Sequence, residues 1–181
     1  MDPFELLNDE HRLIERMLGA LVIYTGRLDE GVGPADMGGF VAFFQRFADA
    51  LHHHKEEDIL FERMIEAGFP RGGGPIAVML HEHEEGRHLV SKLAEAEGRA
   101  GSWTRADHVV LHQTACAFAD LLRTHIHKED MVLYPMARRN LSDEAVTQMA
   151  TTFADMEGFE DVRAERALLV ATANALVARY R

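Results

Sequence analysis

Apolar residues recur along the chain at the three- and four-residue spacing of amphipathic helices, and clusters of glycine and proline separate these stretches. Runs of β-branched residues are short. The pattern predicts helices over roughly 3–28, 36–67, 75–97, 104–139 and 142–181. Long helices joined by short loops are typical of antiparallel neighbours. We therefore expect an all-α fold, an antiparallel up-down four-helix bundle with an additional C-terminal helix.

Signals at the ends of these helices support the pattern. Asp2 before Pro3 is typical of a helix start, and Thr104 with Asp107 resembles a capping box. Pro135 is expected to kink or end the fourth helix, because proline cannot donate a backbone hydrogen bond.

The chain is expected to divide into two parts. Residues 1–140 contain the histidine motifs described below and are predicted to form a metal-binding bundle. Residues 141–181 are amphipathic, with Ser142 as the predicted cap and an interruption at Gly158. We expect this C-terminal helical extension to pack on the bundle or on a partner subunit, which is compatible with an oligomer.

An internal repeat is the most informative motif. The segment His-His-His-Lys-Glu-Glu-Asp-Ile-Leu-Phe, which starts at His52, aligns without a gap with His-Ile-His-Lys-Glu-Asp-Met-Val-Leu-Tyr, which starts at His125. Glu56 and Glu129 take the same place in the two copies. Because residues i and i+4 share one face of a helix, each copy presents an imidazole beside a carboxylate.

A second, shorter repeat precedes each copy. Glu10-His11 and Glu82-His83 are both acid–histidine pairs, and they stand at nearly the same distance before the longer motif. The chain therefore contains the pattern His, then His-x-x-x-Glu, twice. Each helix of the predicted bundle contributes one histidine, and the second and fourth helices also contribute a carboxylate.

Helical periodicity indicates which of these side chains face inward. His11 and His83 fall on the apolar stripes of the first and third helices, where Arg87 is the exception to the third stripe. The stripe of the fourth helix is Phe118, Leu122, His125, Glu129, Val132 and Met136.

The second helix has two registers that periodicity does not separate. One register places His52 and Glu56 inward, and the other places His53 and Glu57 inward. The match to the fourth helix favours His52 and Glu56.

The remaining histidines are expected on the surface or behind the ligands: His53, His54, His81, His88 and His127. His108 and His112 are spaced to share a metal, but no inward carboxylate accompanies them. Asp130 is the substitute if Glu129 does not bridge. Tyr24 and Tyr134 are expected to be aromatic residues of the core or its rim rather than redox groups.

Four inward histidines with two inward glutamates favour a site for two metal ions. Buried carboxylates are costly and repel one another unless protons or cations lie between them. The expected ligands are His11, His52, Glu56, His83, His125 and Glu129. Nitrogen and oxygen ligands without thiolate suit iron or manganese, and zinc also fits these ligand types. Such a pair has room for an oxo or hydroxo bridge and for O₂, NO or peroxide.

Composition argues against several classes of function. The formal net charge is −11, whereas binding to nucleic acid or to an anionic membrane needs concentrated Lys and Arg. No apolar stretch approaches the roughly 20 residues that cross a bilayer, and no signal-peptide pattern begins the chain. The only cysteine, Cys116, cannot form an internal disulfide. We therefore expect a cytoplasmic protein.

Over residues 3–139 the sequence resembles the hemerythrin-like (HHE cation-binding) family. The strings that carry the resemblance are Asn-Asp-Glu-His-Arg-Leu-Ile-Glu, Met-Leu-His-Glu-His-Glu-Glu-Gly-Arg and the two copies of the histidine repeat. The resemblance implies an antiparallel four-helix bundle with a non-haem di-iron centre. Carried over by position, it implies the same six ligands as listed above.

The pattern departs from the oxygen-carrying hemerythrins of that family. Those proteins have a fifth histidine where this chain has Arg87, and they have an aspartate five residues after the last histidine, whereas Glu129 lies at four. The chain is more similar to the bacterial branch linked to NO and oxidative stress, which includes iron-cluster repair proteins. It shows no counterpart of their cysteine-bearing N-terminal extension.

The expected function is that of a di-iron protein that binds O₂, NO or related species for sensing, storage or delivery. The alternatives are an enzyme that reduces NO or decomposes peroxide, an iron donor or iron-centre repair protein, and an interaction module. A redox partner or an iron-acceptor protein is expected, and the sequence does not decide between a binding protein and an enzyme.

Overall fold

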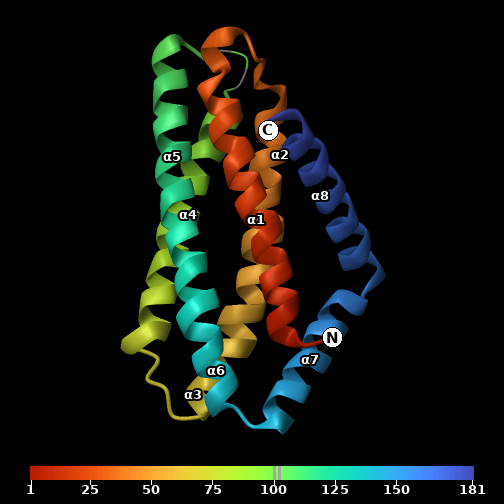
Figure 1. Ribbon diagram of the computed structural model, residues 1–181. Coiled ribbons are helices and arrows are strands. Elements are labelled where there is room, and N and C mark those ends of the chain that lie inside the picture. The colour runs from red at the N-terminus through yellow and green to blue at the C-terminus, as the bar shows by residue number, and fades with distance from the viewer. Residues whose placement is uncertain (100, 102) are drawn as a thin grey trace.

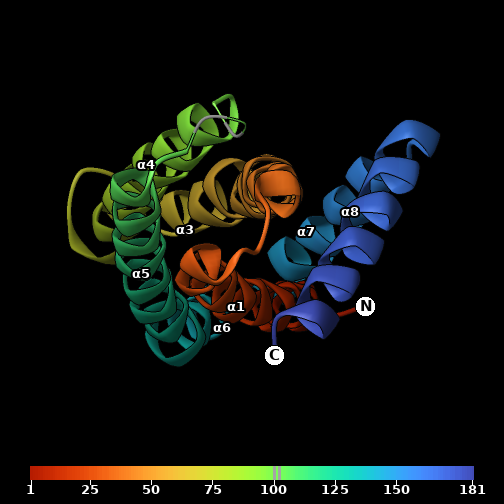
Figure 2. The ribbon, with the colours of Figure 1, turned by 90° about the horizontal axis from the view of Figure 1, so that it is seen from above.

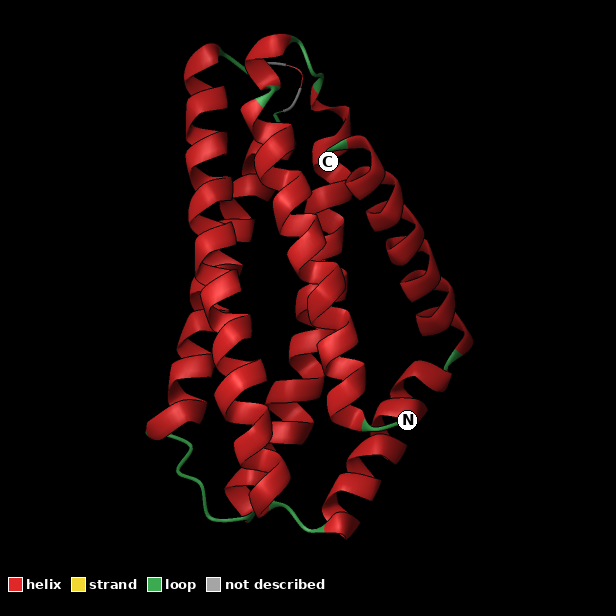
Figure 3. Ribbon diagram, viewed as in Figure 1, coloured by secondary structure: helices red, strands yellow, loops and turns green. Residues whose placement is uncertain are grey.

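The computed structural model describes residues 1–99, 101 and 103–181, and its regular elements are helical throughout these ranges (Figure 1 and Figure 3). Four antiparallel rods form a bundle. They are α1 (Pro3–Gly26); α2 (Met37–Ala42) with η3 (Phe43–His53), η4 (Glu56–Leu60) and α3 (Phe61–Glu66); α4 (Gly74–Glu97); and α5 (Arg105–Lys128) with η6 (Glu129–Leu133) and α6 (Tyr134–Asn140). Two short 3₁₀ turns, η1 (Leu28–Glu30) and η2 (Pro34–Asp36), follow α1. The expected all-α bundle is confirmed.

The predicted helix caps are confirmed. The Asp2 side chain accepts a hydrogen bond from the backbone N–H of Phe4 at 2.8 Å, and the Thr104 capping box has both of its hydrogen bonds. Pro135 does not end the fourth rod, because α6 continues to Asn140.

The second and fourth rods depart from α-helical geometry where they pass the histidine motifs. The segments η3, η4 and η6 are π-helical, with hydrogen bonds between residues five apart, so they shift which residues face inward. Val132, expected to face inward, is 50% exposed, and Leu133 is buried instead. Met136 is only partly buried, whereas Ala137 is buried. The expected stripe beyond Glu129 is wrong because it assumed α periodicity.

Two apolar clusters form the core and leave a polar layer between them. In α1, Phe4 and Leu7 belong to one cluster, Ile14 belongs to the other, and His11 lies between them. In α4 the same order holds for Met79, His83 and Val90. The histidines of the repeats therefore lie near the middle of the bundle, with apolar side chains on both sides.

The C-terminal segment forms α7 (Asp143–Gly158) and α8 (Glu160–Arg179), which meet at an extended Phe159. The expected interruption at Gly158 is confirmed. Both helices lie against α1 and the second rod, away from α4 and α5 (Figure 2). Met149 and Phe153 of α7 are buried in the same cluster as Phe4. Among the described residues, no helix combines the length and apolar character needed to span a membrane.

Candidate metal centre

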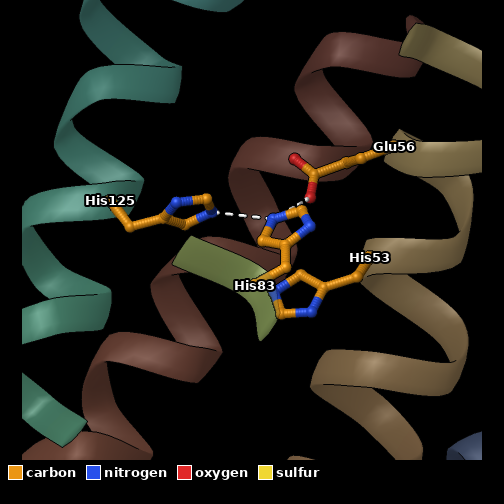
Figure 4. Close-up of side chains that lie close together, drawn as sticks. All are labelled: His53, Glu56, His83 and His125. Carbon is orange, nitrogen blue, oxygen red and sulfur yellow. Dashed lines mark hydrogen bonds and ion pairs between the residues drawn. The ribbon is translucent and has the colours of Figure 1, made fainter. Parts of the chain in front are cut away.

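The six side chains expected as ligands lie together in the polar layer, and each is at most 1% exposed. Together with His53, they provide ligand atoms that fall into two groups sharing Glu56, and within each group all atoms lie within 4.8 Å of one another. The groups are His11, His52, Glu56 and Glu129, and His53, Glu56, His83 and His125. Figure 4 shows the second group, with side chains from three rods converging on one point.

Each glutamate faces histidines from both halves of the internal repeat. The Glu56 carboxylate oxygen Oε2 lies 3.6 Å from His52 Nε2 and 3.5 Å from His83 Nε2. The Glu129 oxygen Oε2 lies 3.2 Å from His11 Nε2 and 3.1 Å from His125 Nε2. Each carboxylate therefore lies between one histidine of the pair His11 and His52 and one of the pair His83 and His125, so it would be shared if each pair held a cation.

A second carboxylate holds the outer nitrogen of each of these histidines. His11 Nδ1 lies 2.7 Å from Asp130, His52 Nδ1 3.0 Å from Glu10, His83 Nδ1 2.6 Å from Glu57, and His125 Nδ1 3.0 Å from Glu82. An ionised carboxylate only accepts hydrogen bonds, so Nδ1 carries the proton and Nε2 presents a lone pair to the interior. Metal-bound histidines typically have this arrangement, because the outer partner fixes the ring and its tautomer.

The interior side of the cluster fits cations. His83 Nε2 and His125 Nε2 lie 2.9 Å apart, although both nitrogens present lone pairs when their Nδ1 atoms are protonated. His52 Nε2, Glu56 Oε2 and both Glu129 oxygens are buried without a hydrogen-bond partner. Buried lone pairs facing one another are unfavourable unless positive charge lies between them. The donor set therefore suits metal ions that take nitrogen and carboxylate ligands.

The pKa values show how strongly the cluster attracts positive charge. Burial opposes a charge on His11, but its hydrogen bond to Asp130 and the nearby Glu129 carboxylate outweigh burial and raise its pKa to about 10. Burial also opposes a charge on His83, but the nearby Glu129 and Glu57 carboxylates outweigh it and raise the pKa of His83 to about 9. Burial, together with the nearby Glu129 carboxylate, raises the pKa of Glu56 well above its usual value. Metal ions would compete with these protons, so binding should release them.

His53 was one of the five histidines expected on the surface or behind the ligands, and in the structure it is buried. It is 6% exposed, and its ring stacks on that of His83 with centroids 3.8 Å apart. The choice between the registers of His52 and His53 assumed that only one could face inward. Because η3 is π-helical, both adjacent histidines are buried, while Glu56 is buried and Glu57 is partly exposed.

A lysine pairs with the outer carboxylate in each half, and the two lysines differ in burial. Lys55 is 0% exposed and lies 2.6 Å from Glu10 and 2.5 Å from Glu157 of α7. Its counterpart Lys128 pairs with Glu82, but its side chain is 38% exposed. The C-terminal helices therefore cover the His52 side and leave the His125 side open.

Two further features lie beside the centre. The buried Tyr134 hydroxyl donates a hydrogen bond to Glu56 and lies 3.3 Å from His11 Nε2. Tyr134 is therefore a core aromatic, as expected, but with a polar contact to the cluster. On the other side, a pocket of about 200 Å³ is lined by His53, Arg87, Asp49, Gln45, Gly86 and apolar residues. The pocket reaches His53, whose ring stacks on that of His83.

The other histidines lie away from the centre. His54, His81, His88 and His127 are exposed, as expected. His108 contacts Asp29 and His112 contacts Thr25, so this pair has separate partners. Asp130 holds His11 from outside, and Glu129 occupies the interior position.

Of the four carboxylates that hold the outer nitrogens, Glu10 and Glu82 had no role predicted from the sequence, whereas Glu57 and Asp130 were considered as acceptors behind the ligands. Glu10 and Glu82 were visible as repeated acid–histidine pairs, but each holds the histidine of another rod rather than its own neighbour. Glu57 and Asp130 take the same place in the two repeat copies, and they hold His83 and His11. The repetition of these four acids was the available signal.

Fold and site together define an all-α bundle protein with a buried cluster of histidines and glutamates whose donor atoms fit metal ions. A family model described as the hemerythrin HHE cation-binding domain matches residues 2–137. The chain belongs to this family.

Similar proteins include iron-sulfur cluster repair proteins. The repair protein DnrN of Neisseria gonorrhoeae is 40% identical over 109 residues, which cover 56% of this chain and 65% of that protein. The repair protein YtfE of Musicola paradisiaca is 34% identical over 144 residues, or 73% of this chain and 61% of that protein. An uncharacterised protein of Mycobacterium tuberculosis is 28% identical over 160 residues, or 86% of this chain and 60% of its own length. The chain thus spans less than two thirds of these relatives. No solved structure matches it significantly.

Proposed function

We propose that this chain is a cytoplasmic non-haem di-iron protein that binds O₂, NO or a related reactive species for sensing, storage or delivery. The proposed ligands are His11, His52, Glu56, His83, His125 and Glu129. The observation that carries the proposal is the cluster of buried Nε2 and carboxylate atoms facing one another, with each Nδ1 held from outside. Manganese or zinc would also fit these nitrogen and oxygen donor atoms.

Each part of the chain has a defined task in this proposal. A pair of iron ions supplies redox chemistry and open positions for a small ligand. Glu56 and Glu129 are placed to bridge, since each faces one histidine of both halves. The outer carboxylates keep the Nδ1 protons and fix the rings, the Tyr134 hydroxyl orients Glu56, and the two apolar clusters limit the entry of water.

A second candidate function is repair of iron-sulfur centres by donation of iron. Two relatives, DnrN and YtfE, are named as iron-sulfur cluster repair proteins, which favours this function. In this case the partners would be proteins with damaged iron-sulfur clusters, and the centre would give up its metal. The more exposed side of the cluster, beside Lys128, is the suitable side for such release.

The ligand set is tested by metal content. Protein reconstituted anaerobically with Fe(II) should hold two ions per chain, and Glu56→Ala or Glu129→Ala should reduce this well below two, because each removes a bridging carboxylate. His81→Ala and His88→Ala are matched controls on exposed histidines and should leave the content unchanged. Full occupancy in both glutamate variants would remove these residues from the site.

Stopped-flow spectra of the ferrous protein separate the functions. A stable and reversible band with O₂ or NO supports binding, and fast multiple turnover with NO or peroxide supports an enzyme. Rapid transfer of iron to an apo iron-sulfur protein, without such bands, would favour repair over the first proposal.

A further inference from the structure

The two copies of the histidine repeat differ at one buried position. His53 in the first copy aligns with Ile126 in the second. Ile126 is 3% exposed and belongs to the apolar core, as expected for a residue beside a ligand on a helix. His53 is 6% exposed at the same place. The first copy therefore brings an additional imidazole into the interior.

The surroundings of His53 match those of the four proposed histidine ligands. Its Nδ1 lies 3.4 Å from the Asp49 carboxylate, so an acidic residue holds its outer nitrogen as well. Arg87 Nε donates to the same carboxylate at 2.8 Å, which holds Asp49 in place. His54 also has an acidic partner at Nδ1, but it is exposed and points away from the cluster. Among the residues that the structure describes, burial and an outer carboxylate occur together only at histidines that line the centre.

The remaining nitrogen of His53 is within reach of a metal ion. One ligand atom of His53 lies within 4.8 Å of those of Glu56, His83 and His125. In the view of Figure 4, Glu56 and His53 lie on either side of the His83 ring.

We propose that His53 is a fifth imidazole ligand, and that it binds the metal ion held by His83 and His125. This inference rests on the two-metal centre proposed above. It makes the centre unequal, with two imidazoles on the His11 side and three on the His83 side. The ion with three imidazoles is the one next to the pocket lined by His53 and Arg87.

Cobalt substitution tests the proposal without relying on activity. Co(II) shifts the Nδ1–H protons of bound imidazoles far outside the usual proton NMR range, and these signals disappear in D₂O. Wild-type protein with two Co(II) per chain should show five such signals. His53→Ile, which copies the second half of the repeat, should show four, and His54→Ala should retain all five. In a chelator competition, His53→Ile should release one of its two ions at roughly 10- to 100-fold lower chelator concentration.

The outcomes separate this inference from the function on which it rests. Wild-type protein that takes up two Co(II) and shows only four signals would overturn the assignment of His53 and leave the two-metal centre intact. Failure to take up two ions would overturn the two-metal centre itself. His53→Gln preserves a polar side chain of similar size, so loss of the same single signal in this variant supports the proposal even if His53→Ile folds poorly.

Discussion

The half of the centre built around His11 and His52 differs from the half built around His83 and His125 in what covers it. In the first half, α7 and α8 lie over the second rod, and Lys55 is completely buried between Glu10 and Glu157. In the second half the equivalent lysine reaches solvent. One sequence motif therefore builds both a closed and an open side, and the difference arises from residues outside the motif.

The two halves of the centre also differ in how an exogenous ligand can approach them. The pocket beside the centre lies on the open side, against His53 and Arg87, where the repeat has an additional histidine. On the closed side, the Tyr134 ring stacks on His11 with centroids 5.5 Å apart, and its hydroxyl contacts Glu56. Its counterpart Phe61 stacks near His83 without a hydroxyl. We expect exogenous ligands to approach from the open side.

Substitution of the outer carboxylates should give the largest difference between the halves in the free energy of unfolding. Glu10→Gln should lower the free energy of unfolding by roughly 3 kcal/mol, because it leaves the buried Lys55 with one acidic partner fewer. Glu82→Gln should lower it by about 1 kcal/mol, since the Lys128 side chain can turn to solvent. Urea unfolding of both metal-free variants measures the difference, and equal losses would contradict the distinction between closed and open sides.

Acid unfolding should report the same carboxylate. Burial would raise the pKa of Glu10, but His52 and Lys55 outweigh it and lower the pKa from 4.5 to about 2. A lowered pKa stabilises the fold at pH values above 4.5, and this contribution is lost as the pH falls toward 2. The shift corresponds to about 3 kcal/mol. Unfolding free energies of metal-free protein should fall across this range, and the fall should be smaller in Glu10→Gln.

Tyr134→Phe should give the closed side the same kind of aromatic contact as the open side, where Phe61 has no hydroxyl. Loss of a buried hydrogen bond to a carboxylate should lower the free energy of unfolding by about 2 kcal/mol, with metal content unchanged. Tyr24→Phe is the control, because the Tyr24 hydroxyl contacts the Gly33 carbonyl at 3.3 Å, away from the centre. A larger loss in the control than in Tyr134→Phe would indicate that the contact to Glu56 contributes little.

The smallest expected effects come from two helical glycines, one on each side. A Cβ at Gly86 would lie 3.7 Å from Phe118 in ordinary contact, so Gly86→Ala should raise the free energy of unfolding by roughly 0.5–1 kcal/mol. A Cβ at Gly39 would lie 3.1 Å from Leu176 of α8, so Gly39→Ala should gain less or lose stability. Thermal melts compare them, and an equal gain in both would mean that α8 is loosely packed.

Helical periodicity was sufficient to predict the rods, their caps and the inward position of the histidines on α1, α4 and α5. It failed where the backbone is π-helical, since the inward register after Glu129 moved from Val132 to Leu133. The same geometry allows His53 to be buried beside His52, which the comparison of α-helical registers did not predict. No local pattern distinguishes a π turn from an α turn in these segments, because the additional residue is accommodated by packing with the other rods.

The support of the centre was harder to predict than its interior. Glu10 holds His52, and Glu82 holds His125, so these contacts join different rods and depend on how the rods are arranged. The burial of Lys55 depends on Glu157, which lies on a helix beyond the motifs. That the six inward residues bind metal stays a prediction until metal content is measured.

The π-helical turns also explain how two different layers can face the same interior. Glu129 and Tyr134 are five residues apart, as are Glu56 and Phe61, and all four are buried. In an α-helix, five residues rotate a side chain by about 140° away from its starting direction, since each residue turns the helix by about 100°. A straight rod could thus direct either its acidic side chain or its aromatic ring toward the axis of the bundle, and the wider turn allows both.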